Sequence, residues 1–152
     1  MSIFSAMRTS ASGLTAQRLR MDVISNNIAN AETTRTAEGG AYRRQEVVFS
    51  PKTVGRVPFF NLLRGDVKNG TVPGLETEGV QPVAIVEDKA PTRRVYDPTN
   101  PDANPDGYVE YPNVNVVTEM TDMLSATRSY EANVTVFNAV KAMAQRALDI
   151  GK

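Results

Sequence analysis

The last third of the chain, residues 113–150, shows the most regular alternation of apolar and polar positions. Apolar or compatible residues recur there at alternating steps of three and four over about four heptads. Neither proline nor glycine interrupts the run between Pro112 and Gly151. This spacing predicts one continuous helix with a coiled-coil face. We predict that this helix contributes seven residues to an assembly interface: Val116, Met120, Met123, Tyr130, Val134, Phe137 and Leu148.

The predicted C-terminal helix is too long to be covered by a compact domain. A helix over residues 113–150 spans on the order of 57 Å. A compact domain of this chain length has a radius of gyration of about 15 Å. The helix is therefore expected to extend beyond its own domain and to pack against a partner.

A second, weaker helical pattern covers residues 3–28. Small Ser, Thr and Ala residues surround its apolar positions, and Gly13 within a helix costs about 1 kcal/mol relative to Ala. We therefore expect a helix that is marginal alone and that allows close approach of another backbone. Packing on its own domain is the alternative to an intermolecular role. The predicted interface residues stand seven apart: Met7, Leu14, Met21 and Ile28.

The middle of the chain differs in composition and pattern. It contains most of the prolines and glycines, with short β-prone runs between them. Residues 46–49 form one run, which Pro51 is expected to end, and residues 65–79 are expected to form a loop. The other short runs are residues 57–63, 80–86, 95–96 and 108–111.

These patterns together predict an α+β fold. Two long terminal helices, within residues 1–31 and 113–152, are expected to pair as a coiled-coil domain. Residues 32–112 are expected to form a small β-rich inserted domain with long loops.

Composition narrows the possible functions. The chain has 17 basic and 17 acidic residues and no His or Cys. The balanced charge argues against nucleic-acid binding, and the missing His and Cys remove the commonest catalytic and thiol chemistry. No apolar run of about 18 residues is present, and the N-terminus lacks the pattern of a secretory signal. A route out of the cytoplasm would therefore use no cleaved peptide.

Three local patterns have a possible chemical interpretation. Asp102, Asn104 and Asp106 match the start of a calcium loop, but position twelve is Asn113 instead of Glu, which favours simple turns. The carboxylates around residues 76–78 and 87–88 are interpreted as solvated surface charge. The remaining alternative is a membrane-surface helix, based on three N-terminal arginines: Arg8, Arg18 and Arg20.

A family resemblance appears where the first predicted helix ends, at Ser25, Asn26, Asn27, Ile28, Ala29 and Asn30. This motif resembles the N-terminal motif of the flagellar axial proteins, the rod and hook family of bacteria. Many members continue into a Ser/Thr-Pro-Gly-Tyr turn, which a longer loop from Thr33 to Arg44 replaces here. That departure, and the second half of the chain, are similar to proximal-rod members. The matching segments there are residues 96–98, 100–104, 107–109, 111–117, 119–120 and 125–134.

The resemblance implies a structural subunit of the proximal rod in the basal body, with no catalysis, bound cofactor, small-molecule substrate or nucleic acid. It implies type III export without a cleaved signal peptide. The terminal helices would polymerise with copies of the chain and other rod proteins into a torque-transmitting shaft. The membrane ring and export apparatus would be further partners. Residues 26–30 would fix how the first helix turns into the insert. A soluble coiled-coil adaptor or secretion chaperone that forms a closed oligomer is the alternative.

Overall fold

The computed structural model describes residues 3–37, 39–54 and 76–150. Two long helices and two small antiparallel hairpins make up this part of the chain. In chain order the elements are α1 (Ile3–Ala29), β1 (Gln45–Val54), β2 (Glu76–Glu87), β3 (Arg93–Tyr96), β4 (Tyr108–Tyr111) and α3 (Val116–Ile150). The predicted α+β arrangement, with long terminal helices and a small antiparallel β insert, is confirmed.

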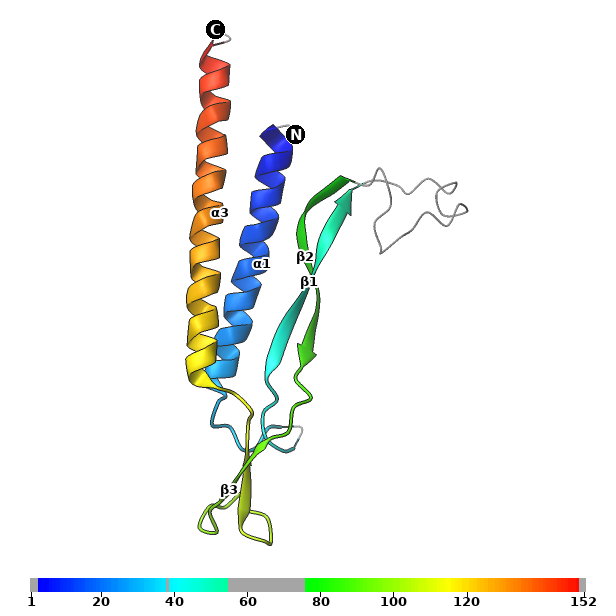
Figure 1. Ribbon diagram of the computed structural model, residues 1–152, viewed down its shortest axis with the longest axis vertical. Helices are drawn as coiled ribbons and strands as arrows, with labels where there is room; N and C mark the ends of the chain where they lie inside the picture. Colours follow the sequence, from blue (N-terminus) through cyan, green and yellow to red (C-terminus); the bar gives the residue numbers. More distant parts are fainter. Residues whose placement is uncertain (1–2, 38, 55–75, 151–152) are drawn as a thin grey trace, which may run out of the picture.

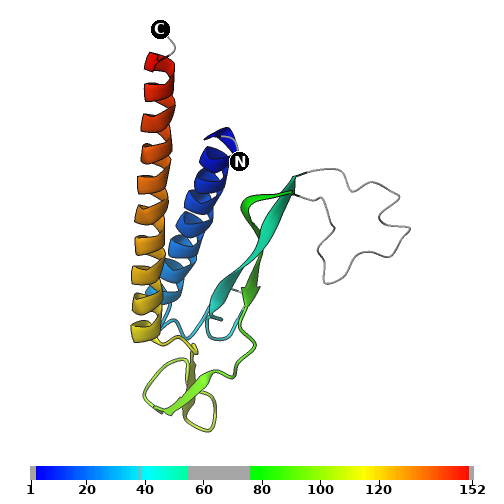
Figure 2. The same cartoon turned by 45° about the horizontal axis from the view of Figure 1, so that its top comes forward.

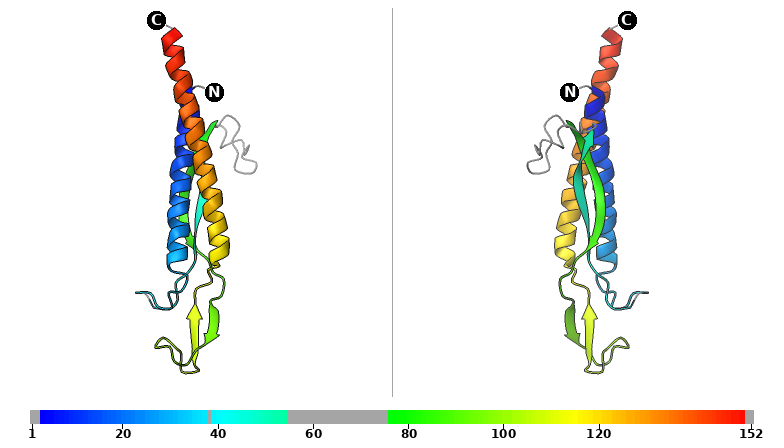
Figure 3. Two further views of the ribbon diagram at one scale, coloured as in Figure 1. Left: turned by 90° about the vertical axis from the view of Figure 1, so that its left-hand side faces the viewer. Right: turned by 90° about the vertical axis from the view of Figure 1, so that its right-hand side faces the viewer.

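Helix α1 lies in the middle of the molecule. Helix α3 runs antiparallel along one side of it, so the two chain ends lie toward the same end of the molecule (Figures 1 and 3). The β1–β2 hairpin lies along the other side of α1 (Figures 1 and 2). The β3–β4 hairpin extends beyond the opposite end, where α1 stops and α3 begins. Helix α1 therefore forms the contacts that hold both α3 and the first hairpin.

Both helices have boundaries that their side chains explain. At the end of α1, the Asn30 side chain donates a hydrogen bond to the Asn26 carbonyl at 2.9 Å. Helix α3 begins at Val116, three positions later than predicted. Asn115 precedes it, and its Oδ1 accepts hydrogen bonds from the amides of Val117 at 3.0 Å and Thr118 at 3.3 Å. Asn115 is thus the N-cap of α3.

The first hairpin is longer than the sequence predicted. Pro51 does not end β1, because the strand continues opposite Val80 with register shifts on either side of the proline. A two-stranded hairpin has open edges and therefore tolerates a residue without an amide proton. Strand β2 begins at Glu76, so residues 76–79 are strand where a loop was expected. Residues 57–63 and the rest of the expected loop, residues 65–75, lie outside the described part.

The apolar core is thin and follows α1. The chain exposes 11187 Å², whereas a compact protein of 16.6 kDa exposes about 7,600 Å². The described side chains that form the core are mostly small, and much apolar surface stays open. The buried apolar residues are Ala16, Val23, Ile24, Val47, Val109, Ala126 and Val140.

Candidate assembly site and the polar junction that positions it

A buried cluster of polar groups joins the end of α1, the start of β1 and the first turn of α3. We call this cluster, made of Asn27, Tyr42, Arg44, Gln45 and Glu119, the polar junction. Asn27 lies at its centre, with 1% of its surface exposed. Three segments that are distant in the sequence therefore meet around one side chain.

Every hydrogen-bonding position of the Asn27 amide is used. Its Nδ2 donates to the Gln45 carbonyl at 2.8 Å and to Glu119 Oε2 at 3.1 Å. Its Oδ1 accepts from the Gln45 amide at 2.9 Å and from the Tyr42 hydroxyl at 3.0 Å. Because an Asn side chain offers two donor hydrogens and an acceptor oxygen with two lone pairs, this buried amide is fully satisfied.

Glu119 supplies the charge of the junction. It is 1% exposed and accepts a hydrogen bond from Arg44 Nε at 2.7 Å. A carboxylate in the first turn of α3 also interacts favourably with the helix dipole. Burial by itself lowers the pKa of Arg44, but the hydrogen bond and the negative charge of Glu119 outweigh it and leave that pKa raised. The Arg44 guanidinium is therefore held in its charged form beside Glu119.

Tyr42 makes the stability of the folded protein depend on pH in the alkaline range. Burial, followed by the negative charges of Glu119 and Glu87, raises the pKa of the Tyr42 hydroxyl above 10.0. The folded protein thus holds this proton more tightly than the unfolded chain does. The resulting stabilisation is fully present below pH 10.0, the ordinary value, and is lost as the pH rises through the raised folded value.

We expect a Tyr42→Phe variant to lose less stability than the wild type as the pH rises above the ordinary tyrosine value. Urea unfolding followed by circular dichroism at neutral and alkaline pH measures this difference. Tyr108→Phe, which changes an exposed tyrosine of the distal hairpin, is the matched control. An equal alkaline loss in the wild type and in Tyr42→Phe would contradict the assignment.

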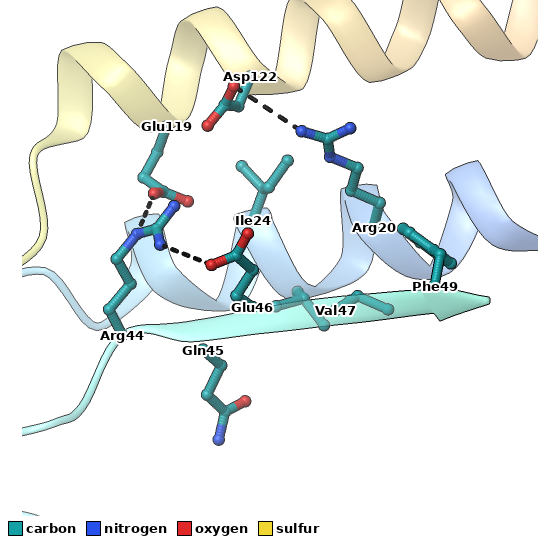
Figure 4. A pocket seen from close by; sticks show the side chains of 10 residues that line it. Arg20, Ile24, Arg44, Gln45, Glu46, Val47, Phe49, Glu119 and Asp122 are labelled. Carbon is teal, nitrogen blue, oxygen red and sulfur yellow. Dashed lines mark hydrogen bonds and ion pairs between the residues drawn. The ribbon is translucent and has the colours of Figure 1, made fainter. Parts of the chain in front are cut away.

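A groove of about 190 Å³ runs beside the junction, between β1 and the start of α3 (Figure 4). Val23 and Ile24 of α1 line it, together with Phe49 of β1. Arg20 and Asp122 lie across it at 3.9 Å. In the described part of the chain, no group of three or more His, Cys, Asp or Glu side chains could hold a metal ion.

Helix α3 packs against α1 through a row at alternating steps of four and three residues. Among the described elements, only α1 packs on α3. The central contact brings Asn133 against Gly13. A Cβ built on Gly13 would lie 3.0 Å from Nδ2 of the Asn133 side chain. The buried or half-buried row on α3 is Glu119, Met123, Ala126, Tyr130, Asn133, Phe137 and Val140.

The predicted interface residues divide between two environments. Met7, Leu14, Met21 and Ile28 on α1, and Met123, Tyr130, Val134 and Phe137 on α3, are half-buried. Val116, Met120 and Leu148 are exposed. In the family motif at residues 25–30, Asn27 is buried and Ile28 and Asn30 are half-buried. Ser25, Asn26 and Ala29 are exposed. The role of these residues in assembly stays a prediction.

Helix α3 also carries exposed apolar side chains near its start. Val116, Val117, Met120 and Leu124 are 40%, 74%, 57% and 61% exposed. They fall within nine consecutive positions, which span a little more than two helical turns. We call this group the outward patch. Exposed apolar groups of this kind mark surfaces that bind other proteins.

Two further contacts position the first hairpin, and sequence patterns alone did not reveal them. Ser12 Oγ accepts a hydrogen bond from the Val80 amide at 3.1 Å, and Arg8 forms an ion pair with Glu78 at 3.0 Å. Gly79 has a φ of +90°, and a Cβ there would collide with Ser12 Oγ. The absence of a side chain at Gly79 therefore permits the hairpin to contact α1.

The Asp102 segment forms turns, as the sequence favoured. Asp102 Oδ2 accepts a hydrogen bond from Thr34 at 2.7 Å, and its other oxygen lies 3.9 Å from Arg35. The Gly107 amide donates to the Asn104 carbonyl at 2.8 Å. The Asp102 carboxylate thus joins two loops of the insert. Neither helix, over its described residues, is long and apolar enough to cross a membrane.

The geometry defines an elongated α+β protein with antiparallel terminal helices and exposed apolar surface. Comparisons with known proteins give the particular family. Residues 7–35 match the model described as "Flagella basal body rod protein". Residues 106–150 match "Flagellar basal body rod FlgEFG protein C-terminal".

Full-length relatives agree with these matches. The chain is 47% identical to the flagellar basal-body rod protein FlgC of Borreliella burgdorferi, over 99% of this chain and 98% of that protein. It is 46% identical to FlgC of Bacillus subtilis and 36% identical to FlgC of Salmonella typhimurium, over the whole of both chains.

The chain belongs to the flagellar basal-body rod protein FlgC family. It is a structural subunit of the basal-body rod and not an enzyme. The predicted family and the predicted structural role are therefore confirmed.

Proposed function

We propose that the chain is a subunit of the proximal rod that polymerises through its terminal helices into a torque-transmitting shaft. The outward patch is the observation that carries this proposal. Val117 is 74% exposed and Leu124 61% exposed, although both belong to a well-formed helix. A second polypeptide that covers the patch removes this apolar area from water, which stabilises the assembly.

The spacing on α3 supports coiled-coil pairing of the terminal helices. Steps of four and three residues place one row of side chains continuously toward α1. Residues 1–31 and 113–152 would then form the axial core domain, and residues 32–112 the inserted domain. A stiff pair of helices suits a part whose work is mechanical.

The asymmetry of the molecule supports an open assembly. The outward patch lies near one end of α3, and α3 continues past the start of α1 at the other end (Figure 1). Contacts between two unlike ends are heterologous, and repeated heterologous contacts build open helical tubes. Copies of this chain and other rod proteins are the proposed neighbours. The membrane ring and export apparatus are further proposed partners, with export by the flagellar type III route.

We expect the double change Met120→Asp with Leu124→Asp to abolish rod assembly while the subunit stays folded. Both side chains are exposed, so the new carboxylates remain in water in the free subunit. In an assembled rod they would be buried without partners, which is strongly unfavourable. Electron microscopy of basal bodies and swimming assays of a deletion strain that carries the variant measure the effect.

The matched control is Thr121→Asp with Ser125→Asp, which adds the same charges at two exposed polar positions of the same helix. We expect this variant to assemble. Normal swimming with the Met120 and Leu124 variant would refute the outward patch as an assembly surface.

A further inference from the structure

Helix α3 has two possible faces for packing on α1, and the face in use turns a carboxylate inward at the base of the helix. Both faces share Met123, Tyr130 and Phe137. The face in use adds Glu119, Ala126, Asn133 and Val140, all buried or half-buried. The competing face, rotated by about 50° around the helix axis, would add Met120, Thr127, Val134 and Lys141. Thr127 and Val134 are already half-buried, and Thr127 donates a hydrogen bond to Met21 Sδ at 3.6 Å, so the exposed Met120 and Lys141 are its new members.

Apolar burial at the base of α3 favours the competing face. Met120 would bury a large apolar side chain where Glu119 buries a carboxylate. A charged group is retained in such a place only when it is paired and hydrogen-bonded. Arg44 and Asn27 provide both conditions, at 2.7 Å and 3.1 Å.

We propose that the polar junction sets the rotation and register of α3 against α1. Buried polar groups are best known for this role in paired helices, where a single amide fixes alignment and partner choice. Asn27 and Arg44 present hydrogen-bonding groups to the base of α3, and Glu119 is the α3 side chain that accepts from both. A rotation of α3 onto the competing face moves Met120 toward this place and leaves Asn27 Nδ2 and Arg44 Nε without that carboxylate.

The junction thereby determines which surface remains for neighbouring subunits. With Glu119 inward, Met120 is 57% exposed and forms part of the outward patch. With Met120 inward, the patch would lose a central member. Only this consequence rests on the proposed function, because the register itself is a property of the single chain.

A contact at mid-helix makes the register measurable. A Cβ on Gly13 would lie 3.2 Å from Asn133 Cγ, so the two Cβ positions are within about 4.7 Å, near the range for a disulfide. The chain has no Cys, so any disulfide arises from introduced residues. Gly13→Cys with Asn133→Cys reports the observed register, and Gly13→Cys with Val134→Cys reports the rotated one.

The test variant is Arg44→Leu with Glu119→Leu, which replaces the buried ion pair with apolar side chains. Arg128→Leu with Glu131→Leu removes the same two residue types from exposed positions of α3 and is the matched control. Each background carries each cysteine pair in the full-length chain. Disulfide yields are measured in the purified protein and in isolated basal bodies.

We expect the ratio of the 13–133 to the 13–134 disulfide to fall by roughly tenfold or more in the test variant relative to the control. A fall below about threefold overturns the proposal, because buried polar contacts of purely stabilising effect would lower both yields together. Loss of both disulfides, or no 13–133 disulfide in the wild-type background, overturns it as well. A changed ratio together with normal swimming of the Met120 and Leu124 variant would uphold the register role and refute the proposed assembly surface.

Discussion

Replacing Asn27 with Ala is expected to destabilise the folded chain by about 4 kcal/mol, because several buried groups lose their partners at once. The Gln45 amide and carbonyl, the Tyr42 hydroxyl and Glu119 Oε2 each lose a hydrogen bond to Asn27. Domains of this size are stable by about 5–15 kcal/mol, so the loss is a large share of the total. Urea unfolding followed by circular dichroism measures it.

Asn26 provides the control for this change. It precedes Asn27 in the same motif, but its side chain is exposed, so Asn26→Ala is expected to change stability by less than about 0.5 kcal/mol. Equal losses at the two positions would show that helix propensity, and not the polar junction, accounts for the effect.

Replacing Gly79 with Ala is expected to separate the first hairpin from α1, with a loss of about 3–5 kcal/mol. Two effects combine there. The φ of +90° is unfavourable for a residue with a side chain, and the new Cβ would collide with Ser12 Oγ. The hydrogen bond from the Val80 amide to that oxygen is lost as well. Amide hydrogen exchange of β1 and β2 measures the loss of protection.

Gly39 separates the two effects. Its φ is also +90°, but nothing lies within 4 Å of a Cβ at that position. Gly39→Ala therefore reports the backbone strain alone, which we expect to be about 1 kcal/mol. If both alanine variants lose the same stability, the close contact between Gly79 and Ser12 has no energetic role.

The helices were predictable from sequence because their signals are local and repeated. The spacing of apolar residues gave α1 almost to the residue. Helix α3 was placed with an error only at its start, where Asn115 caps the first turn. Strands were harder to delimit. Pro51 and Gly79 usually interrupt strands, but register shifts accommodate the first and contact with Ser12 requires the second.

The residue that α3 turns inward at its base was not predictable from apolar spacing. Apolar character at this position selects Met120, whereas the structure turns Glu119 inward. The partners that permit this burial, Asn27 and Arg44, lie 92 and 75 positions away in the sequence. No local pattern contains that information. The only sequence signal was the Asn-rich motif at the end of the first helix, which identified a family but did not name Glu119 as a partner.

The separation between Asn27 and Glu119 also bears on how fast the chain folds. Their hydrogen bond closes a loop of 92 positions, and loop-closure entropy must be overcome before such a contact stabilises anything. Chains dominated by contacts of this kind fold slowly for their size. We therefore expect the β3–β4 hairpin, whose strands are close in sequence, to form early and the helix pair to form last. A newly made chain would then remain unfolded, and able to pass through a narrow export channel, for longer than a helical protein with local contacts.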